Sequence, residues 1–552
     1  MEYKEEKNLT NQINCMQNKK EKKNIFESLT EGWDKDYEAD EVPPYLKEIR
    51  MAVIGNVDSG KSTLVGCLTK GIKDDGRGYA RKFVFNYQHE TESGRTSSIA
   101  EEIIGFKNEK MVYGGRINDK KNVSWKEIAS QSDHVITFLD LCGHEKYLKT
   151  TMYGVSALMP HYAIILIGAN MGVKRMTKEH LGIVYSLGIP FFIVFTKIDI
   201  APKEAREKTI NDLTSILKKG LNKTVFNVKS EKDAEFAAQE ISGGNLVPTF
   251  QVSTVSDEGI EDLKTFLSKL SPKFPNFNDF CLLKTPKEKT EMLLDNAINT
   301  KVGCVYAGVI VSGKIEVNQK LLMGPTLDGE FKLVQVREIQ FLRVTVNELC
   351  CGNSCSLKLK SLDKSFELST NNFRKGMVLL DPETKLEPTM EFEVKALILH
   401  HSSTIKVGYQ SVVHCHVIRQ TCTIVKINKE YLRAGDTGII RFKFLKKPEF
   451  MHVGDTILFR EGRTRGKGKI TQIFPLDLSK LNKDKKGNTN KKQQPKANNE
   501  KNNNINANTT TNNNNKKGKN KFFKNKNQNQ SKNQVNESEN KDNKNNLKKN
   551  EG

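Results

Sequence analysis

Short apolar runs alternate with helical stretches between residues 48 and 272. The runs at 51–54, 135–139 and 191–195 are continuous, as expected for strands buried on both faces, and helical stretches such as 63–70 and 203–219 lie between such runs. Two polar interruptions, 108–122 and 222–245, predict loops. The alternation predicts an α/β domain, a parallel sheet with helices on both faces.

The pattern changes at about residue 287 to short strands of period two, separated by Gly and Asn turns, as in residues 303–315. Two consecutive all-β barrels fit the length up to residue 475. The predicted organisation is a polar N-terminal extension, the α/β domain, a linker, barrel domains II and III, and a tail. Their ranges are 1–47, 48–272, 273–286, 287–383, 384–476 and 477–552.

A phosphate-binding loop, G-x-x-x-x-G-K-S, follows the first apolar run directly. Its glycines let successive backbone N–H groups point at a β-phosphate, while Lys61 reaches the β- and γ-phosphates and the Ser62 hydroxyl ligates Mg²⁺. The loop alone leaves a GTPase and an ATP-using enzyme open. The candidate phosphate-binding residues are Gly55, Asn56, Val57, Asp58, Ser59, Gly60, Lys61, Ser62 and Thr63.

Two later strands end in polar motifs that decide between these nucleotides. Asp140 opens a D-x-x-G-H element in which its carboxylate can hold Mg²⁺ through water and Gly143 can donate its N–H to the γ-phosphate. Asp199 closes a T-K-x-D element, where a carboxylate accepts the N1 and N2 protons of guanine. Taken singly, each motif is also compatible with a helix cap or a polar turn. The candidate guanine-binding residues are Thr196, Lys197, Asp199, Ser253, Thr254 and Val255.

Long local matches in residues 55–64, 89–98, 140–151 and 459–464 resemble the translational GTPases related to elongation factor Tu, and within them the GTP-binding protein 1/2 group. The resemblance covers about residues 48–475. It implies that the α/β domain is a GTP-binding (G) domain, that Mg²⁺ is the cofactor, and that His144, Lys61 and Gly143 are catalytic. His144 would orient the attacking water; the alternative is a histidine that only caps the following helix.

The first switch region departs from the family pattern R-G-I-T-I, which aligns with residues 95–99. The metal-binding threonine becomes Ser98, so the implied metal ligands are Ser62, Ser98 and Asp140. The isoleucine of the hydrophobic gate becomes Ser97, which would face Val57, and we expect an altered intrinsic rate of hydrolysis. Asp58 matches the phosphate-loop aspartate of the family.

In elongation factor Tu the two barrels hold the acylated end and the stem of tRNA, so the resemblance implies tRNA or another RNA and the ribosome as partners. The basic stretch 460–469 can grip a phosphate backbone or anchor a barrel on the G domain, and we favour packing because Glu461 lies within it. Two further possibilities are a GTP-dependent adaptor in RNA surveillance that delivers no tRNA, with partners in RNA decay, and a GTPase subunit of an initiation-factor or sulfate-activating complex.

Charge and cysteine usage limit the class of protein further. Of the net charge of +22, +12 lies in residues 481–552, which contain 18 Lys against 6 Asp plus Glu. This Asn/Lys-rich composition predicts disorder. The lysines could contact RNA phosphates, or the segment could reflect compositional bias alone. The ten cysteines are scattered, which favours reduced thiols in the cytoplasm. Two clusters could hold a transition metal, but neither has paired C-x-x-C spacing, so we expect core cysteines there and no transition metal. The clusters are Cys350, Cys351 and Cys355, and His414, Cys415, His416 and Cys422. No apolar run is long enough to span a bilayer, and we expect a monomer.

Overall fold

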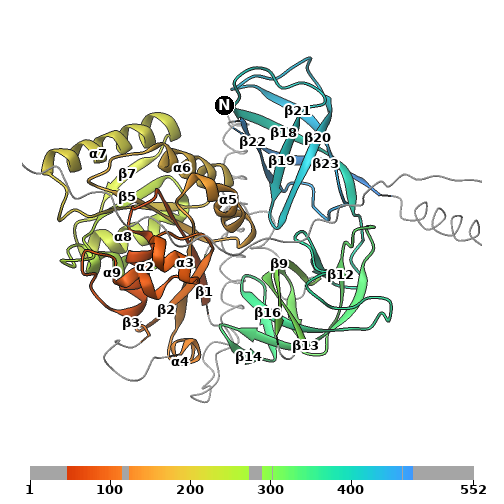
Figure 1. Ribbon diagram of the computed structural model, residues 1–552, viewed down its shortest axis with the longest axis horizontal. Helices are drawn as coiled ribbons and strands as arrows, with labels where there is room; N and C mark the ends of the chain where they lie inside the picture. Colours follow the sequence, from red (N-terminus) through yellow and green to blue (C-terminus); the bar gives the residue numbers. More distant parts are fainter. Residues whose placement is uncertain (1–46, 115–123, 273–288, 301–302, 463, 477–552) are drawn as a thin grey trace, which may run out of the picture. The chain divides into compact units, whose positions relative to one another are not determined.

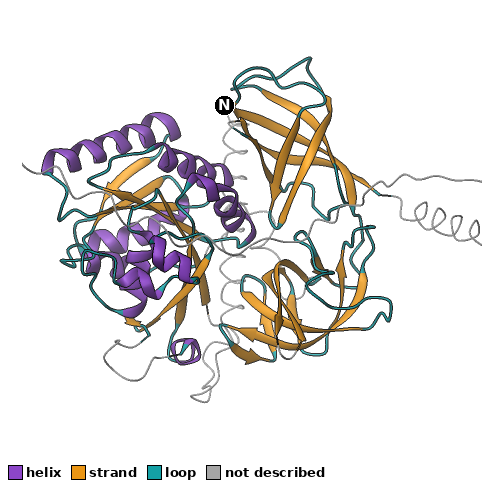
Figure 2. Ribbon diagram, viewed as in Figure 1, coloured by secondary structure: helices purple, strands orange, loops and turns teal. Residues whose placement is uncertain are grey.

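The computed structural model describes residues 47–114, 124–272, 289–300, 303–462 and 464–476. The predicted N-terminal extension apart from Lys47, the linker and the tail lie outside these residues. Figure 1 shows the α/β domain and the strand-rich part, coloured along the sequence. Within the described residues, helices occur only before residue 273 (Figure 2). No helix among them has the length and apolar character needed to cross a membrane.

The sheet of the first domain contains eight strands in the order β3-β2-β4-β1-β5-β6-β8-β7. The six from β4 to β7 in this order pair in parallel, whereas β2 and β3 form an antiparallel edge that the sequence pattern did not indicate. The strands are β1 (Lys47–Gly55), β2 (Ala100–Lys107), β3 (Lys110–Val112), β4 (His134–Asp140), β5 (Tyr162–Gly168), β6 (Phe191–Thr196), β7 (Thr224–Asn227) and β8 (Leu246–Gln251).

Helices cover both faces of this sheet, because successive residues of a buried strand point to opposite sides. Met51 and Val53 of β1 belong to the apolar cluster that contains residues of α2, α8 and α9, while Ala52 and Ile54 belong to the cluster with α5, α6 and α7. The predicted arrangement of a parallel sheet between two helical layers is thereby confirmed. The helices are α2 (Lys61–Lys70), η1 (Ala80–Phe83), α3 (Gln88–Ser93), α4 (Trp125–Ser130), η2 (Glu145–Tyr147), α5 (Leu148–Ala157), α6 (Arg175–Leu187), α7 (Lys203–Ser215), η3 (Ile216–Gly220), α8 (Glu231–Glu240), η4 (Ile241–Gly243) and α9 (Ile260–Ser268).

The loop predicted at 222–245 is wrong, because this segment forms β7 and α8. Ser230 caps α8 by accepting a hydrogen bond from the Asp233 backbone N–H, and Ala234, Ala237 and Ala238 bury one face of the helix. Small alanines at helical spacing give a weak hydrophobic signal although they pack well against a sheet. Of the other predicted loop, 108–122, residues 110–112 form β3, and residues 115–122 lie outside the described residues.

The first β domain has a seven-stranded sheet in the order β12-β17-β9-β10-β16-β13-β14, and an additional β12–β13 pairing closes six of these strands into a ring. Its inward-facing residues, such as Tyr306, Val336 and Leu357, form one apolar cluster. The strands are β9 (Glu291–Thr300), β10 (Gly303–Ser312), β11 (Lys314–Glu316), β12 (Lys320–Gly324), β13 (Lys332–Phe341), β14 (Val344–Val346), β15 (Glu348–Cys350), β16 (Ser354–Ser361) and β17 (Val378–Leu380).

The second β domain is a closed barrel, β18-β21-β20-β19-β22-β23. Alternation along its first strand sends Phe392, Val394, Ala396 and Ile398 into the barrel core, where each is fully buried. Both β domains therefore follow the period-two prediction. The strands are β18 (Thr389–His400), β19 (Gln410–Cys415), β20 (Ile418–Ile427), β21 (Thr437–Phe444), β22 (Thr456–Glu461) and β23 (Thr464–Pro475).

A buried ion pair connects the strand β1 to the first β domain. Glu48 accepts hydrogen bonds from Arg50 at 3.0 Å, from the Thr137 hydroxyl at 2.7 Å, and from the backbone N–H and hydroxyl of Ser354, both at 2.9 Å. Arg50 also donates to the Gly352 carbonyl at 2.8 Å. The strand that leads into the phosphate loop is thus hydrogen-bonded to two residues of the first barrel.

Candidate nucleotide-binding site

The predicted site residues follow strands that end at one edge of the sheet. In the parallel register, Gly55 of β1 lies beside Leu166 of β5, Gly168 of β5 lies beside Thr196 of β6, and the next strand, β8, ends in the same direction. Asp140 ends β4 beside Val53. Because ligands of open α/β sheets bind outside the carboxyl ends of the strands, this edge is the expected place for a nucleotide.

The phosphate loop connects β1 to the N-terminus of α2. A Cβ at Gly55 would lie 2.5 Å from the Leu166 carbonyl oxygen, and Gly60 has a φ of 82°, so the loop depends on both glycines. The first turn of α2 has no acidic residue and no side-chain cap. Its N–H groups therefore remain for an anion, which is the arrangement that binds phosphate at helix N-termini.

Lys61 lies beside this loop and is almost fully buried. Its ammonium group donates to the Asn56 carbonyl at 3.0 Å. Burial lowers the pKa of Lys61, and the Asp140 carboxylate opposes this effect. A phosphate would add a second opposing negative charge, so the site favours an anionic ligand beside Lys61.

Three oxygen ligands suitable for Mg²⁺ meet at the strand edge. The Ser62 hydroxyl donates to Asp140 Oδ2 at 2.6 Å, and the Thr96 hydroxyl lies 2.9 Å from Ser62 Oγ and 3.3 Å from Asp140 Oδ2. The second carboxylate oxygen, Asp140 Oδ1, is buried and has no hydrogen-bond partner among the described residues. Hard oxygen donors with an unsatisfied buried carboxylate fit Mg²⁺, which is held by such ligands together with phosphate.

The serine predicted to bind the metal has a different contact in this structure. Ser98 and Ser97 both donate, through backbone N–H and hydroxyl, to Glu90 Oε1 at distances of 2.6–3.1 Å. Burial alone raises the pKa of the fully buried Glu90, but these four hydrogen bonds hold it below its usual value. Thr96, two residues earlier, has the position beside Ser62 and Asp140. The role of Ser98 as a metal ligand stays a prediction, and the geometry favours Thr96 in its place.

Gly143 and His144 follow Asp140 at the start of the second switch region. A Cβ at Gly143 would lie 2.5 Å from the Lys61 ammonium and 2.8 Å from the Gly55 carbonyl oxygen, so only glycine fits this close to the phosphate loop. His144 Nδ1 accepts a hydrogen bond from the Lys146 N–H at 3.0 Å and caps η2. The capping alternative is therefore realised here, while the exposed ring also lines the cavity beside Lys61.

The predicted guanine-binding residues leave the same edge on adjacent loops. Thr196 donates its hydroxyl to the Ser59 carbonyl at 2.8 Å, which connects the T-K-x-D loop to the phosphate loop. Asp199 is exposed in the turn that follows. The buried Ser253 hydroxyl accepts from the backbone N–H of Val255 at 3.2 Å, and the Thr254 carbonyl accepts from Asp74 at 2.9 Å. These contacts shape the second loop, whereas recognition of the base stays a prediction.

Sequence reasoning missed four residues of this region: Thr96, Glu90, Arg81 and Arg95. The two arginines line a cavity of about 50 Å³ together with Lys61, Thr96 and His144. Within the described part of the chain, no hydrogen bond or ion pair is found for the Arg81 guanidinium, which lies against Gly94. The positive charge of the two arginines was a usable signal, because a phosphate site attracts basic side chains. Both arginines lie far from the phosphate loop in the sequence, however, so the sequence pattern did not place them beside it.

Comparison with known proteins agrees with this geometry. Residues 47–274 match the model of the elongation factor Tu GTP binding domain. The chain is 40% identical over 430 residues to GTP-binding protein 2 of Homo sapiens, covering 77% of this chain and 69% of that one. The chain belongs to the family of GTP-binding protein 2. GTP-binding protein 1 of Xenopus laevis is also 40% identical, over 429 residues, and there the match spans 77% of this chain and 64% of the relative.

Solved structures of two elongation factors share the fold of this chain. The bacterial selenocysteine-specific elongation factor EF-Sec aligns with a TM-score of 0.56 and 21% identity, over 80% of this chain and 61% of that one. Elongation factor SelB from Methanococcus maripaludis, in complex with the GTP analogue GppNHp, aligns with a TM-score of 0.54 and 19% identity, over 78% and 81%. At these identities the likeness establishes the fold.

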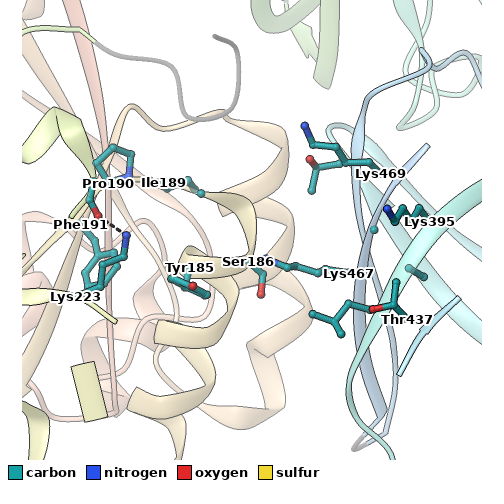
Figure 3. Close-up of a pocket in the computed structure, with 16 residues that line it drawn as sticks. Tyr185, Ser186, Ile189, Pro190, Phe191, Lys223, Lys395, Thr437, Lys467 and Lys469 are labelled. Atoms are coloured by element: carbon teal, nitrogen blue, oxygen red, sulfur yellow. Dashed lines mark hydrogen bonds between the residues drawn. The ribbon is translucent and has the colours of Figure 1, made fainter. Parts of the chain in front are cut away.

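The basic stretch 460–469 of this family member has two kinds of contact. Arg460 and Arg465 form ion pairs with Glu179 of α6 at 3.2 and 2.9 Å, which agrees with the packing role we favoured. Lys467 and Lys469 instead line a cavity of about 530 Å³ with Lys395 (Figure 3). The side chains labelled there come from α6, from the start of β6, from loops of the first domain and from the second barrel.

Proposed function

We propose that this chain binds and hydrolyses GTP and couples the GTP and GDP states to the binding and release of an RNA. The expected cargo is tRNA, on the ribosome or in the quality control of ribosomes and mRNA. The observation that carries the proposal is the contact of Ser62, Thr96 and Asp140. It joins the phosphate loop, the first switch region and the strand that leads to the second switch region, as a GTP-Mg²⁺ sensor requires.

Each residue has a defined task in hydrolysis. Lys61 neutralises charge that develops on the transferred phosphoryl group, and Gly143 donates its N–H to the γ-phosphate. Ser62, Thr96 and Asp140 would hold Mg²⁺, which would neutralise negative charge on the phosphates. His144 swings from its capping position to orient water, a movement that costs about one ordinary hydrogen bond, roughly 1 kcal/mol.

Loss of the γ-phosphate is the event that resets the switch. Gly143 would then lose its phosphate acceptor and Thr96 would lose any metal that it held, while Glu90 still accepts from Ser97 and Ser98. The first switch region is therefore released as a unit that pivots on Glu90. The ion pair of Glu48 and Arg50 offers a route from the phosphate-loop strand to the first barrel.

RNA binding is supported by charge. Lys395, Lys467 and Lys469 line one cavity, and no ion pair is found for them within the described residues. Ammonium groups that lack a carboxylate partner suit a phosphate backbone, whose affinity then falls as the salt concentration rises. We expect Lys467→Ala with Lys469→Ala to weaken RNA binding and reduce its salt dependence, without change in GTP affinity.

Nucleotide binding is tested by calorimetry with GTP and ATP on the parent chain and on Asp199→Asn. The parent should prefer GTP by at least about 100-fold, because adenine lacks the N1 and N2 protons and the loss of these two hydrogen bonds to Asp199 costs about 3 kcal/mol. Asp199→Asn should lose this preference and bind xanthosine triphosphate better, because its amide can donate to the xanthine carbonyl. Equal affinity of the parent for ATP and GTP refutes the assignment of the base.

The RNA role is tested separately, by GTP hydrolysis with and without ribosomes and by crosslinking of the GTP-bound protein to cellular RNA. Ribosome-stimulated hydrolysis that His144→Ala abolishes, with tRNA among the crosslinked species, supports delivery. Slight stimulation with copurifying decay factors supports the surveillance adaptor instead.

A further inference from the structure

A cluster of thiol, imidazole and carboxylate lies in the second barrel, away from the nucleotide site. Cys415 and His416 stand at the turn between β19 and β20, and Asp455 lies just before β22, strands labelled in Figure 1. One ligand atom from each of the three lies within 4.8 Å of the other two. His416 Nε2 is 3.4 Å from Asp455 Oδ1.

The alternation of a strand predicts Cys415 and His416 on opposite faces, and the structure shows why this rule ends here. Cys415 pairs with Ile418, so only His416 and Val417 form the turn. His416 has a φ of 48°, a left-handed conformation that is uncommon for a residue with a side chain. The turn brings the imidazole to the same side as the buried thiol, where Asp455 arrives from a segment forty residues away.

We propose that Cys415, His416 and Asp455 bind one borderline divalent metal ion of the Zn²⁺ class. In a tetrahedral site with metal–nitrogen and metal–oxygen distances of about 2.0 Å, the two ligand atoms lie about 3.3 Å apart. The separation of 3.4 Å between His416 Nε2 and Asp455 Oδ1 fits that edge. A mixed sulfur, nitrogen and oxygen set favours Zn²⁺ over Mg²⁺ or Ca²⁺.

Charge balance supports the same assignment. A thiolate, a carboxylate and a neutral imidazole together neutralise a divalent cation, so the filled site carries no net charge in a barrel where Cys415 is only 1% exposed. Binding breaks the Cys415 S–H bond, forms a sulfur–metal bond and releases the proton to solvent.

Neighbouring groups orient the proposed ligands. Asp455 Oδ2 accepts a hydrogen bond from the His452 backbone N–H at 2.9 Å, which fixes the carboxylate, and His452 Nε2 lies 3.0 Å from Glu291 Oε1. A cavity of about 20 Å³, lined in part by His416, Asp455 and His452, has room for one water. A water there would complete a coordination number of four, as in zinc sites with three protein ligands.

The simpler arrangement is a His416–Asp455 ion pair beside an inert buried thiol. It predicts neither bound metal nor a metal–thiolate bond. The two arrangements therefore differ in sulfur ligation, which can be observed directly.

The experiment measures the metal content of the purified full chain by mass spectrometry and then titrates the chelator-stripped protein with Co²⁺. The variants are Cys415→Ser and Asp455→Asn, and the matched control is Cys422→Ser, which alters a buried cysteine of the same barrel outside the cluster. Circular dichroism confirms folding, and GTP affinity is measured in parallel. Saturating Mg²⁺ and GTP block Co²⁺ at the oxygen-only nucleotide site.

We expect about one Zn²⁺ per parent chain and, with Co²⁺, a sulfur-to-cobalt charge-transfer band with the visible bands of four-coordinate cobalt. Cys415→Ser removes the charge-transfer band, and Asp455→Asn weakens Co²⁺ binding by at least about tenfold. Cys422→Ser changes neither, and GTP affinity stays the same in all three. A parent chain that binds no Co²⁺, or a Cys415→Ser variant that keeps the band, overturns the proposal without touching the proposed GTPase function.

Discussion

The buried pair of Glu48 and Arg50 offers a test of how the phosphate-loop strand is held on the first barrel. The side chains of Glu48 and Arg50 are 0% and 2% exposed, and Glu48 accepts from Arg50, Thr137 and Ser354. Glu48→Ala removes the carboxylate that accepts from the buried Arg50 guanidinium at 3.0 Å. Breaking such a pair from one side costs about 3–5 kcal/mol, because an uncompensated charge remains inside.

This cost can be converted into a melting temperature. For a domain of about 150–250 residues, 1 kcal/mol corresponds to about 2–4 °C, so the transition of the G domain should fall by about 6–20 °C in scanning calorimetry of the full chain. Saturating GTP, which stabilises only the folded G domain, identifies that transition by raising it. Glu48→Gln, which keeps the shape and one acceptor oxygen, should cost less.

The control is Glu261→Ala, which removes the exposed partner of Lys264 one turn away on α9. Exposed pairs contribute little, so this variant should melt with the parent. If Glu48→Ala also melts within about 2 °C of the parent, the pair does not hold the strand, and the route from phosphate loop to barrel loses its physical basis.

Three further predictions concern single side chains. Thr96→Ala should weaken Mg²⁺-dependent GTP binding by about 10- to 100-fold, the value of one charge-assisted contact, whereas Ser98→Ala should leave it unchanged. If Ser98→Ala weakens binding and Thr96→Ala does not, Ser98 is the metal ligand after all. Arg81→Ala should lower the rate of single-turnover GTP hydrolysis by about 100-fold or more, with partial recovery in Arg81→Lys and little change in GTP affinity, if its guanidinium reaches the transferred phosphoryl group. Burial, together with the charges of Lys61 and Arg460, lowers the pKa of His180 to about 3. Below about pH 6.5, His180 is therefore protonated in the unfolded chain but stays neutral in the folded chain. The stability from a neutral His180 is complete above pH 6.5 and is lost as pH falls, by about 1.4 kcal/mol per unit, and His180→Leu should flatten this part of a pH–melting curve.

Local motifs on regular strands were predictable because a strand end and its loop are set by neighbours in sequence. The phosphate loop, Asp140 and the T-K-x-D element all follow apolar runs, and the parallel register places them at one edge. Alternation of period two likewise predicted both barrels. The α8 segment was missed because alanines carry little hydrophobic signal, although they pack closely against the sheet.

Contacts that depend on distant segments needed the tertiary structure. The family pattern placed the metal-binding hydroxyl of the first switch region at Ser98. In the structure Ser97 and Ser98 donate to Glu90, and Thr96 lies beside Ser62 instead. No spacing rule joins Cys415 to Asp455, since a turn with a left-handed residue and a separate loop bring them together. The sequence by itself determined which chemistry the chain carries and on which elements. Only the fold decided which side chains meet, because a hydrogen bond or a ligand contact needs a separation of a few ångströms that chain distance does not specify.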